Sequence, residues 1–308
     1  MNRLLLIGFL LITLFIYHPF SALGAPMDVF VSIPPQKWLC DQVGGKLVTT
    51  HILVGQGQDP HTFEPSPRQI VALSQAKLFF TVGMTFEKRI GHKLERVSGG
   101  LSLIDISENV HKIPMSTNEH THDKKPGHSQ YVQKDDISHG GLDPHIWLSP
   151  VNLKLMAANM AEAMIRADPL NGSKYERNLD NTTRRLNRIH STITKELAPY
   201  KGASVYVFHP AFGYFFHTYN LKQIAVEIEG KAPTPKQLAS LITQARSSGV
   251  KVIFVQPQFD PKSAAAIAAA IGGSVIPLNP LAEDVEANLE LIAGKIKETL
   301  MNQHETNQ

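Results

Sequence analysis

The sequence predicts an α/β protein with parallel sheets, built as two lobes that one long helix connects. Three observations support this fold class. Short apolar runs alternate with helical patterns in the first part of the chain, and the same alternation restarts after residue 200. Between the two series lies a long helical stretch, Ser173 to Leu197, which contains neither Pro nor Gly. Strands that alternate with helices form parallel sheets with helices on their faces.

The strands are expected at apolar runs of four to seven residues. Those of the first series are 29–33, 48–54, 78–82 and 101–104, and those of the second are 204–208, 223–226, 252–255 and 275–278. A helix over Gln36 to Val43 follows the first strand. The chain has 308 residues, of which 43% are hydrophobic and 19% charged. This composition is that of a globular protein and excludes a disordered, collagen-like or polytopic membrane protein.

Four later helices are expected to begin with the same local chemistry. Each start pairs a side-chain acceptor at the N-cap with Pro at the first helical position, as in Ser66-Pro67, Ser149-Pro150, Thr234-Pro235 and Asp260-Pro261. The acceptor satisfies a free backbone N–H, and Pro has no N–H to lose. Gln69 and Gln237 stand three residues after their caps and complete capping boxes.

The stretch Ser173 to Leu197 is rich in charged and amide side chains. A thin apolar stripe runs along it, formed by Leu179, Leu186, Ile189, Ile193 and Leu197. So polar a helix suits a connector that lies across two lobes, although an ordinary surface helix of a single domain would show the same pattern. We expect a first lobe at 25–170, the connector at 171–198 and a second lobe at 199–308.

The N-terminus has the pattern of a signal peptide. Arg3 precedes fourteen mainly apolar residues, Leu4 to Tyr17, and small residues follow, which places cleavage after Gly24. The apolar run is shorter than the roughly 20 residues of a membrane span, although an uncleaved anchor is the other interpretation. The single cysteine, Cys40, lies too far downstream to carry a lipid. The sequence therefore predicts export to a periplasm as a soluble protein without a lipid anchor.

Residues 115–141 interrupt the globular pattern. They lack apolar periodicity and contain four of the 14 histidines of the chain, namely His120, His122, His128 and His139. Such a segment is expected to be a long polar loop, and His-rich composition is typical of metal binding. We interpret it as an accessory metal-binding loop; a solvated loop with incidental histidines is the alternative.

Three other histidines share one context, because each lies beside a proline near an expected strand end or turn. His61 and His145 both follow Asp-Pro, and His209 comes directly after the strand at 204–208. Ligands of α/β proteins bind beyond the carboxyl ends of the strands. Three neutral imidazoles suit zinc, whereas manganese and magnesium prefer more oxygen ligands.

The motifs around these residues make the sequence similar to a known family. It resembles the metal-binding solute receptors of zinc and manganese ABC importers (ZnuA/TroA-like) from about Val29 to Leu300. The segments that carry the resemblance are 60–67 (PHTFEPSP), 143–148 (DPHIWL), 208–215 (FHPAFGYF) and 255–259 (VQPQF). The resemblance implies two lobes joined by a long helix, with a metal in the cleft between them, and a His-rich insertion like that of zinc members.

The resemblance also implies the ligands. His61 and His145 match the histidines of the first lobe, and His209 matches a second-lobe position that is His in zinc members and often Glu in manganese members. The fourth position departs from the family, because Asn279 stands where Asp is frequent and Pro60 stands where some zinc members have Glu. The fourth ligand is left open between Asn279, Asp59, a water and a loop histidine.

The function implied is high-affinity binding of Zn²⁺ and its delivery to an ABC permease of the inner membrane, without catalysis. The alternatives are the same role for Mn, Fe, Ni or Cu, a zinc enzyme with a three-histidine site, and an adhesin. A formal net charge of +3 without a clustered basic bias speaks against a nucleic-acid partner. We expect a monomer.

Overall fold

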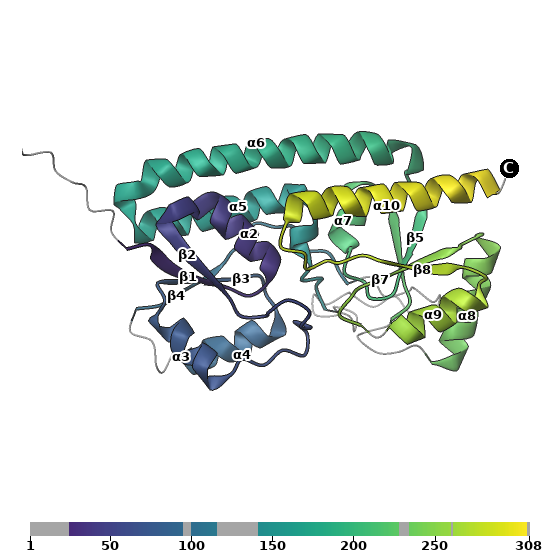
Figure 1. Ribbon diagram of the computed structural model, residues 1–308, viewed down its shortest axis with the longest axis horizontal. Helices are drawn as coiled ribbons and strands as arrows, with labels where there is room; N and C mark the ends of the chain where they lie inside the picture. Colours follow the sequence, from purple (N-terminus) through teal and green to yellow (C-terminus); the bar gives the residue numbers. More distant parts are fainter. Residues whose placement is uncertain (1–24, 95–99, 116–140, 228–233, 260, 307–308) are drawn as a thin grey trace, which may run out of the picture.

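The computed structural model describes residues 25–94, 100–115, 141–227, 234–259 and 261–306. They form two lobes, each around a parallel sheet of four strands (Figure 1). The first sheet has the order β2-β1-β3-β4, with strands Met27–Val31 (β1), Val48–Ile52 (β2), Leu78–Thr81 (β3) and Ser102–Asp105 (β4). The second has the order β6-β5-β7-β8, with strands Ser204–Val207 (β5), Lys222–Ala225 (β6), Val252–Val255 (β7) and Ser274–Pro277 (β8). The predicted fold class is confirmed.

Helices cover both faces of each sheet. In the first lobe, α2 and α5 lie above the sheet and α3 and α4 below it, with bounds Pro34–Gly44 (α2), Pro67–Gln75 (α3), Thr85–Leu94 (α4) and Pro150–Ala167 (α5) (Figure 1). In the second lobe, α10 lies above and α8 and α9 below, and the bounds are Gly213–Thr218 (α7), Pro235–Ser247 (α8), Pro261–Ala270 (α9) and Val285–Thr306 (α10). Short 3₁₀ turns occupy Gly45–Leu47, Ile146–Leu148, Pro169–Asn171 and Ala198–Tyr200.

The long helix α6, Gly172–Leu197, crosses the top of both lobes (Figure 1). It packs on α2 and α5 of the first lobe and on α10 of the second. The predicted apolar stripe faces these helices: Leu186, Ile189, Ile193 and Leu197 are buried, and Leu179 packs against them while partly buried. The apolar stripe of this polar helix therefore belongs to both lobes at once, which ties them together.

The predicted helix caps are confirmed in two of the four positions. Ser66 and Thr234 accept hydrogen bonds from the backbone N–H groups of Gln69 and Gln237 and form complete capping boxes. Ser149 is the N-cap of α5 and Pro150 its first residue, as predicted, but the expected hydrogen bond from the helix to the Ser149 hydroxyl is absent. That hydroxyl lies 2.9 Å from Thr218 Oγ1, so a contact with α7 replaces the local cap. Asp260 lies outside the described residues.

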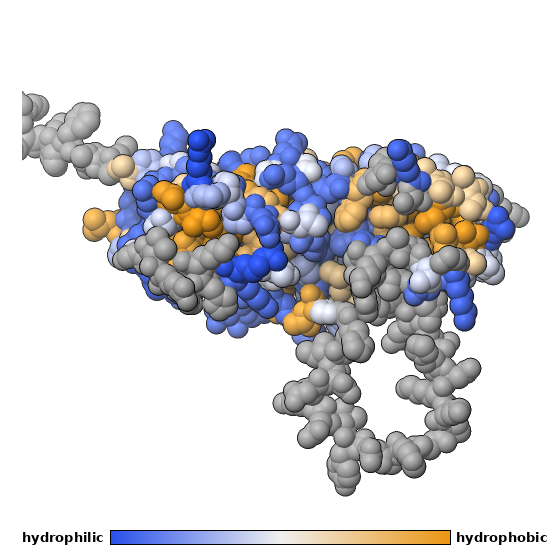
Figure 2. Space-filling view, turned by 90° about the horizontal axis from the view of Figure 1, so that it is seen from below, coloured by the Kyte–Doolittle hydropathy of each residue, from blue (hydrophilic) through white to orange (hydrophobic). Residues whose placement is uncertain are grey.

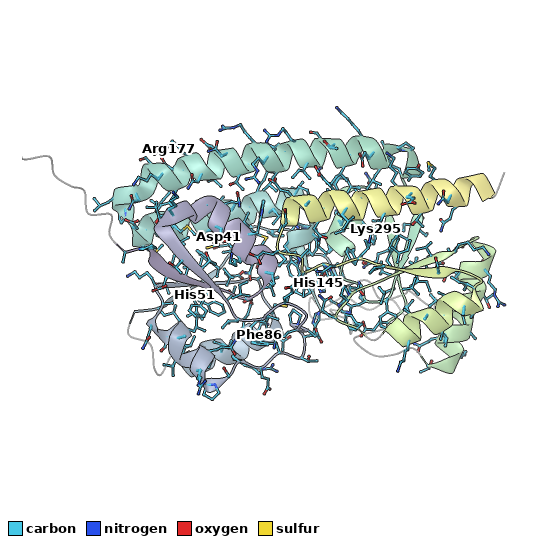
Figure 3. All side chains as sticks on the ribbon, in the orientation of Figure 1. Asp41, His51, Phe86, His145, Arg177 and Lys295 are labelled. Carbon is cyan, nitrogen blue, oxygen red and sulfur yellow. The ribbon has the colours of Figure 1, made fainter. Side chains whose placement is uncertain are left out.

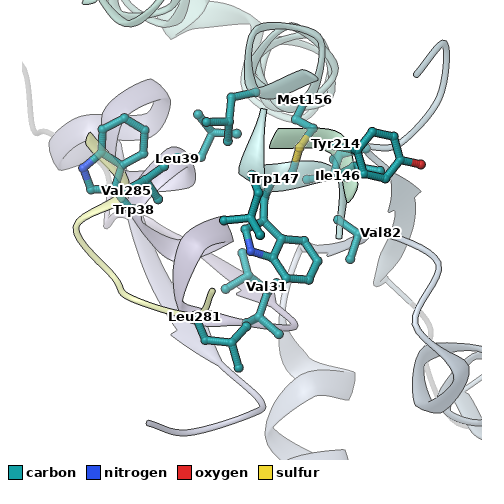
Figure 4. Packing of buried hydrophobic residues seen from close by; sticks show 14 of the residues in the cluster. Val31, Trp38, Leu39, Val82, Ile146, Trp147, Met156, Tyr214, Leu281 and Val285 are labelled. Carbon is teal, nitrogen blue, oxygen red and sulfur yellow. The ribbon is translucent and has the colours of Figure 1, made fainter. Parts of the chain in front are cut away.

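Trp147 joins the two lobes at their centre. Val31 of the first lobe and Leu281 of the second lie on the same side of its indole (Figure 4). The side chain is only 1% exposed, and its Nε1 donates a hydrogen bond of 2.7 Å to the carbonyl oxygen of Pro280. The main apolar cluster accordingly continues from the first lobe into α10, while a second cluster fills the space between the second sheet, α8 and α9.

The underside of the molecule, formed by α3, α4, α8 and α9, is of mixed polarity. Apolar side chains gather over each lobe and hydrophilic ones surround them (Figure 2). Among the described residues, no helix combines the length and the apolar character that crossing a membrane requires.

Candidate metal centre

The three predicted histidines meet between the lobes. His61 lies in the connection from β2 to α3, His145 precedes the turn Ile146–Leu148, and His209 follows β5. One ring nitrogen of each lies within 4.8 Å of those of the other two. Figure 3 places His145 at the middle of the molecule, where the first lobe meets the second. Both lobes thus contribute imidazoles to one site.

The spacing of the rings suits a tetrahedral ion. His61 Nε2 and His145 Nε2 are 3.3 Å apart, and the three ring centroids are 5.0 to 5.3 Å from one another. Two nitrogens bound to zinc at its usual distance and angle are about 3.3 Å apart. A contact of this length can also be an N–H···N hydrogen bond in which His61 donates to His145. The convergence of three ring nitrogens from two lobes is what favours a metal ion.

Asp143 fixes the ring of His145 from behind. Its Oδ1 accepts hydrogen bonds from His145 Nδ1 at 2.7 Å and from the backbone N–H of His145 at 2.9 Å. Both residues are buried. An ionised carboxylate only accepts, so the proton of the neutral imidazole is on Nδ1 and the lone pair on Nε2 faces the cavity. The second Asp-Pro-His motif is therefore a unit that orients a ligand.

Glu227 does the same for His209 in the second lobe. Its Oε2 lies 2.6 Å from His209 Nδ1, and both side chains are buried. Gln256 holds the backbone of His209 on both sides, accepting from its N–H at 3.2 Å and donating to its carbonyl oxygen at 2.8 Å. The ring of Phe259 stacks on the imidazole with centroids 5.0 Å apart. His209 Nε2 is buried and has no hydrogen-bond partner among the described residues.

Sequence reasoning missed Glu227 and Gln256 as supporting residues. Glu227 follows the end of β6 and Gln256 follows β7, so both stand at the carboxyl edge of the second sheet. The rule that ligands bind at this edge, which singled out His209, could have found them as well.

His61 is held by the turn that contains it. Its backbone N–H donates to Asp59 Oδ1 at 2.9 Å, and Asp59 Oδ2 accepts from the hydroxyl of Thr62 at 3.1 Å. Desolvation of the ring, followed by the charges of His145 and His209, lowers the pKa of His61 to about 4, although the residue keeps contact with solvent. The imidazole is neutral at pH 7, as a metal ligand must be.

Asp59 and Asn279, two of the alternatives predicted for the fourth ligand, differ in whether they reach the cavity. Asp59 lines the cavity of the three histidines, whereas Asn279 does not. Asn279 Oδ1 accepts two hydrogen bonds of 3.0 Å, from Gln258 Nε2 and from the backbone N–H of Leu281. Gln258 itself lines the cavity.

The four histidines of the His-rich segment, His120, His122, His128 and His139, lie outside the described residues. The ends of the segment are described and lie together. Pro114 and Leu142 form an antiparallel bridge, and the N–H of Met115 donates to the carbonyl oxygen of Gly141 at 3.1 Å. The segment therefore leaves the first lobe and returns to it at one point.

Comparison with known proteins places the chain in a family. The model of "Zinc-uptake complex component A periplasmic" matches residues 29–298. The chain is 30% identical over 266 residues to the "High-affinity zinc uptake system protein ZnuA" of Paracoccus denitrificans, covering 80% of each chain. It is 27% identical to the "Manganese ABC transporter substrate-binding lipoprotein PsaA" of Streptococcus anginosus, covering 71% of this chain and 69% of that one.

A solved structure described as "Crystal structure of ZnuA" has the same architecture. It superposes with a TM-score of 0.79 at 37% identity, covering 89% of this chain and 99% of that one. These relatives are binding components of uptake systems and not enzymes, which agrees with a site made of ligands and their supports. Because the family model spans nearly the whole described chain, the protein belongs to the family of zinc-uptake complex component A, the substrate-binding receptors of ABC importers.

Proposed function

We propose that this protein is a periplasmic receptor that binds Zn²⁺ through the Nε2 atoms of His61, His145 and His209 and delivers it to an ABC importer. The observation that carries the proposal is the meeting of three imidazoles from two lobes in one cavity, with ligand atoms within 4.8 Å of one another. Zinc binds such nitrogens at about 2.0–2.1 Å and holds His61 and His145 of one lobe to His209 of the other.

The buried carboxylates supply the charge that three neutral imidazoles lack. Asp143 and Glu227 each hold the Nδ1–H of one ligand, at 2.7 and 2.6 Å. Such outer carboxylates raise the basicity of the histidine and fix its ring. The three histidines provide no anionic ligand. The two negative charges close behind them therefore balance the charge of a divalent cation.

Manganese is the second candidate, because one relative carries manganese in its name. The donor set favours zinc, since imidazole nitrogen suits zinc and manganese prefers oxygen. Nickel, copper and iron also accept imidazole, so cellular supply as well as affinity determines the cargo.

The proposal includes where the protein works and which partner it meets. Residues 1–24 act as a signal peptide, and the mature chain works as a soluble monomer without a lipid anchor. Family members work with an ABC permease, and the cognate permease of the inner membrane is the partner we propose here. The histidines of residues 115–141 form an accessory, weaker metal-binding segment.

A competition titration tests the proposal. The metal-free mature protein is titrated with zinc and, separately, with manganese against a chromophoric chelator. We expect about one tight zinc per chain, much weaker manganese binding, and loss of the tight zinc in His209→Ala. Tight binding of manganese in preference to zinc would contradict the assignment of the cargo, and tight zinc in His209→Ala would contradict the site.

A further inference from the structure

The side chain of Gln258 has an oxygen atom that no described residue uses. Gln258 follows β7 and lines the cavity of the three histidines. The residue as a whole is partly exposed, yet its Oε1 is buried and has no hydrogen-bond partner among the described residues. A buried carbonyl oxygen without a partner costs about 1–3 kcal/mol, so a native site that keeps one needs a reason.

The hydrogen bonds around Asn279 determine which end of the Gln258 amide is bonded and which end is free. The N–H of Leu281 can only donate, so the atom of Asn279 that lies 3.0 Å from it is the oxygen Oδ1. The same Oδ1 lies 3.0 Å from the Gln258 amide and requires a donor there, which is Nε2. The oxygen Oε1 of Gln258 is thereby the end of the amide that has no partner among the described residues, and no alternative flip of either amide satisfies both contacts.

The other side-chain oxygen atoms of residues that line the cavity, those of Asp59 and Gln256, each accept a hydrogen bond. Asp59 uses both carboxylate oxygens within its own turn, and Gln256 uses both ends of its amide on the backbone of His209. Asp143 Oδ2 is buried without a partner among the described residues, but Asp143 does not line the cavity and lies behind His145 against Gly213. Among the side chains that line the cavity in the described part of the chain, Gln258 supplies the buried oxygen that accepts no hydrogen bond.

We propose that Gln258 Oε1 is the fourth ligand of the metal and that Asn279 orients it. This inference rests on the proposed zinc site and completes it. His209 and Gln258 follow β5 and β7, the neighbouring strands at which the order of the second sheet changes direction, where α/β folds place their ligands. The amide carbonyl is neutral, and the anionic charge comes from Asp143 and Glu227 behind the histidines.

The test replaces Gln258 by Met, which keeps the length of the side chain and removes the oxygen. Zinc affinity is measured by competition titration for wild type, Gln258→Met, the exposed control Gln75→Met and His209→Ala. We expect Gln258→Met to weaken zinc binding at least about tenfold, the scale on which even residues behind the ligands act. Gln75→Met should match wild type, and His209→Ala should lose the tight site.

A second readout separates a ligand from a residue that only shapes the cavity. In protein labelled with [¹³C]glutamine, the side-chain carbonyl resonance that is missing in Gln258→Met should shift when one equivalent of zinc is added. Unchanged affinity in Gln258→Met, or an unmoved resonance, would overturn the assignment of Gln258 while His209→Ala still identifies the zinc site. Absence of tight zinc in wild type would overturn the proposed function and this inference together.

Discussion

Glu227 allows the effect of one supporting residue on metal affinity to be measured. It contacts the Nδ1 side of His209, opposite the nitrogen proposed to bind the metal. Its carboxylate accepts the Nδ1–H of His209 at 2.6 Å and is buried with it. Removal of such a partner costs about 10–100-fold in metal affinity. Glu227→Gln keeps an acceptor and loses the charge, so we expect about a tenfold weaker zinc affinity, whereas Glu227→Ala loses both and should approach a hundredfold.

The control for these variants is Glu290→Gln, which neutralises an exposed carboxylate of α10. It should bind zinc like wild type in the same competition titration. Equal affinities for wild type and Glu227→Ala would show that the orientation of the His209 ring does not depend on this carboxylate.

Local sequence patterns predict the contacts that form within one turn, but not those between segments distant in the chain. The two Asp-Pro-His motifs position His61 and His145 locally, because each turn is held by its own aspartate. The contact of Glu227 with His209 joins the ends of two strands, so no local pattern encodes it. The same holds for Ser149, whose hydroxyl meets Thr218 rather than its own helix, while Ser66 and Thr234 cap theirs as predicted.

At the scale of elements, Glu87 fixes the connection between β3 and α4 beside the site. Its carboxylate accepts from the backbone N–H groups of Val82, Gly83 and Met84 and from the hydroxyl of Ser32. Gly83 has a φ of 93°, which glycine adopts readily and which turns three successive N–H groups toward one carboxylate. Met84 in turn lines the metal cavity.

Glu87→Ala should lower the free energy of unfolding by about 3 kcal/mol or more, because it leaves several buried N–H groups without an acceptor. Glu87→Gln keeps the oxygen that faces these N–H groups and should cost less. Urea denaturation of the metal-free protein measures both. If Glu87→Ala were as stable as wild type, the carboxylate would not hold this connection.

The same residue gives a pH dependence with a definite sign. Burial raises the pKa of Glu87 from 4.5 to about 7. Between these values the folded chain keeps a proton that the unfolded chain has lost, so the contribution of Glu87 to stability falls as the pH rises from about 4.5 to 7. Glu87→Gln cannot titrate, so the stability of wild type relative to this variant should decline over that window. A constant or rising difference would contradict the raised pKa.

At the scale of the whole molecule, ion pairs join the lobes in addition to Trp147 and the apolar stripe of α6. Lys37 of α2 contacts Glu283 at 2.9 Å, and Arg185 of α6 contacts Glu286 of α10 at 2.8 Å. Each of these partly exposed pairs adds little alone. Together with the shared apolar cluster they limit how far the lobes separate, so we expect only a small movement when zinc binds.

The His-rich segment should be separable from the tight site. Because the chain leaves and returns at the bridge between Pro114 and Leu142, a short Gly-Ser linker can replace residues 116–140 without strain. We expect calorimetric titration of this deletion to show the tight zinc unchanged and weaker sites lost. Loss of the tight zinc would show that a histidine of the segment belongs to the cleft.

The central claim is that one zinc binds where His61, His145 and His209 meet between the lobes. The most direct test is elemental analysis of the purified mature protein and of a variant with all three histidines replaced by Ala, each after exposure to zinc and removal of weakly bound metal. We predict about one zinc per chain in wild type and none retained in the variant, with the fold of both verified by circular dichroism. Zinc retained by the folded triple variant would move the binding site away from the cleft and contradict the account.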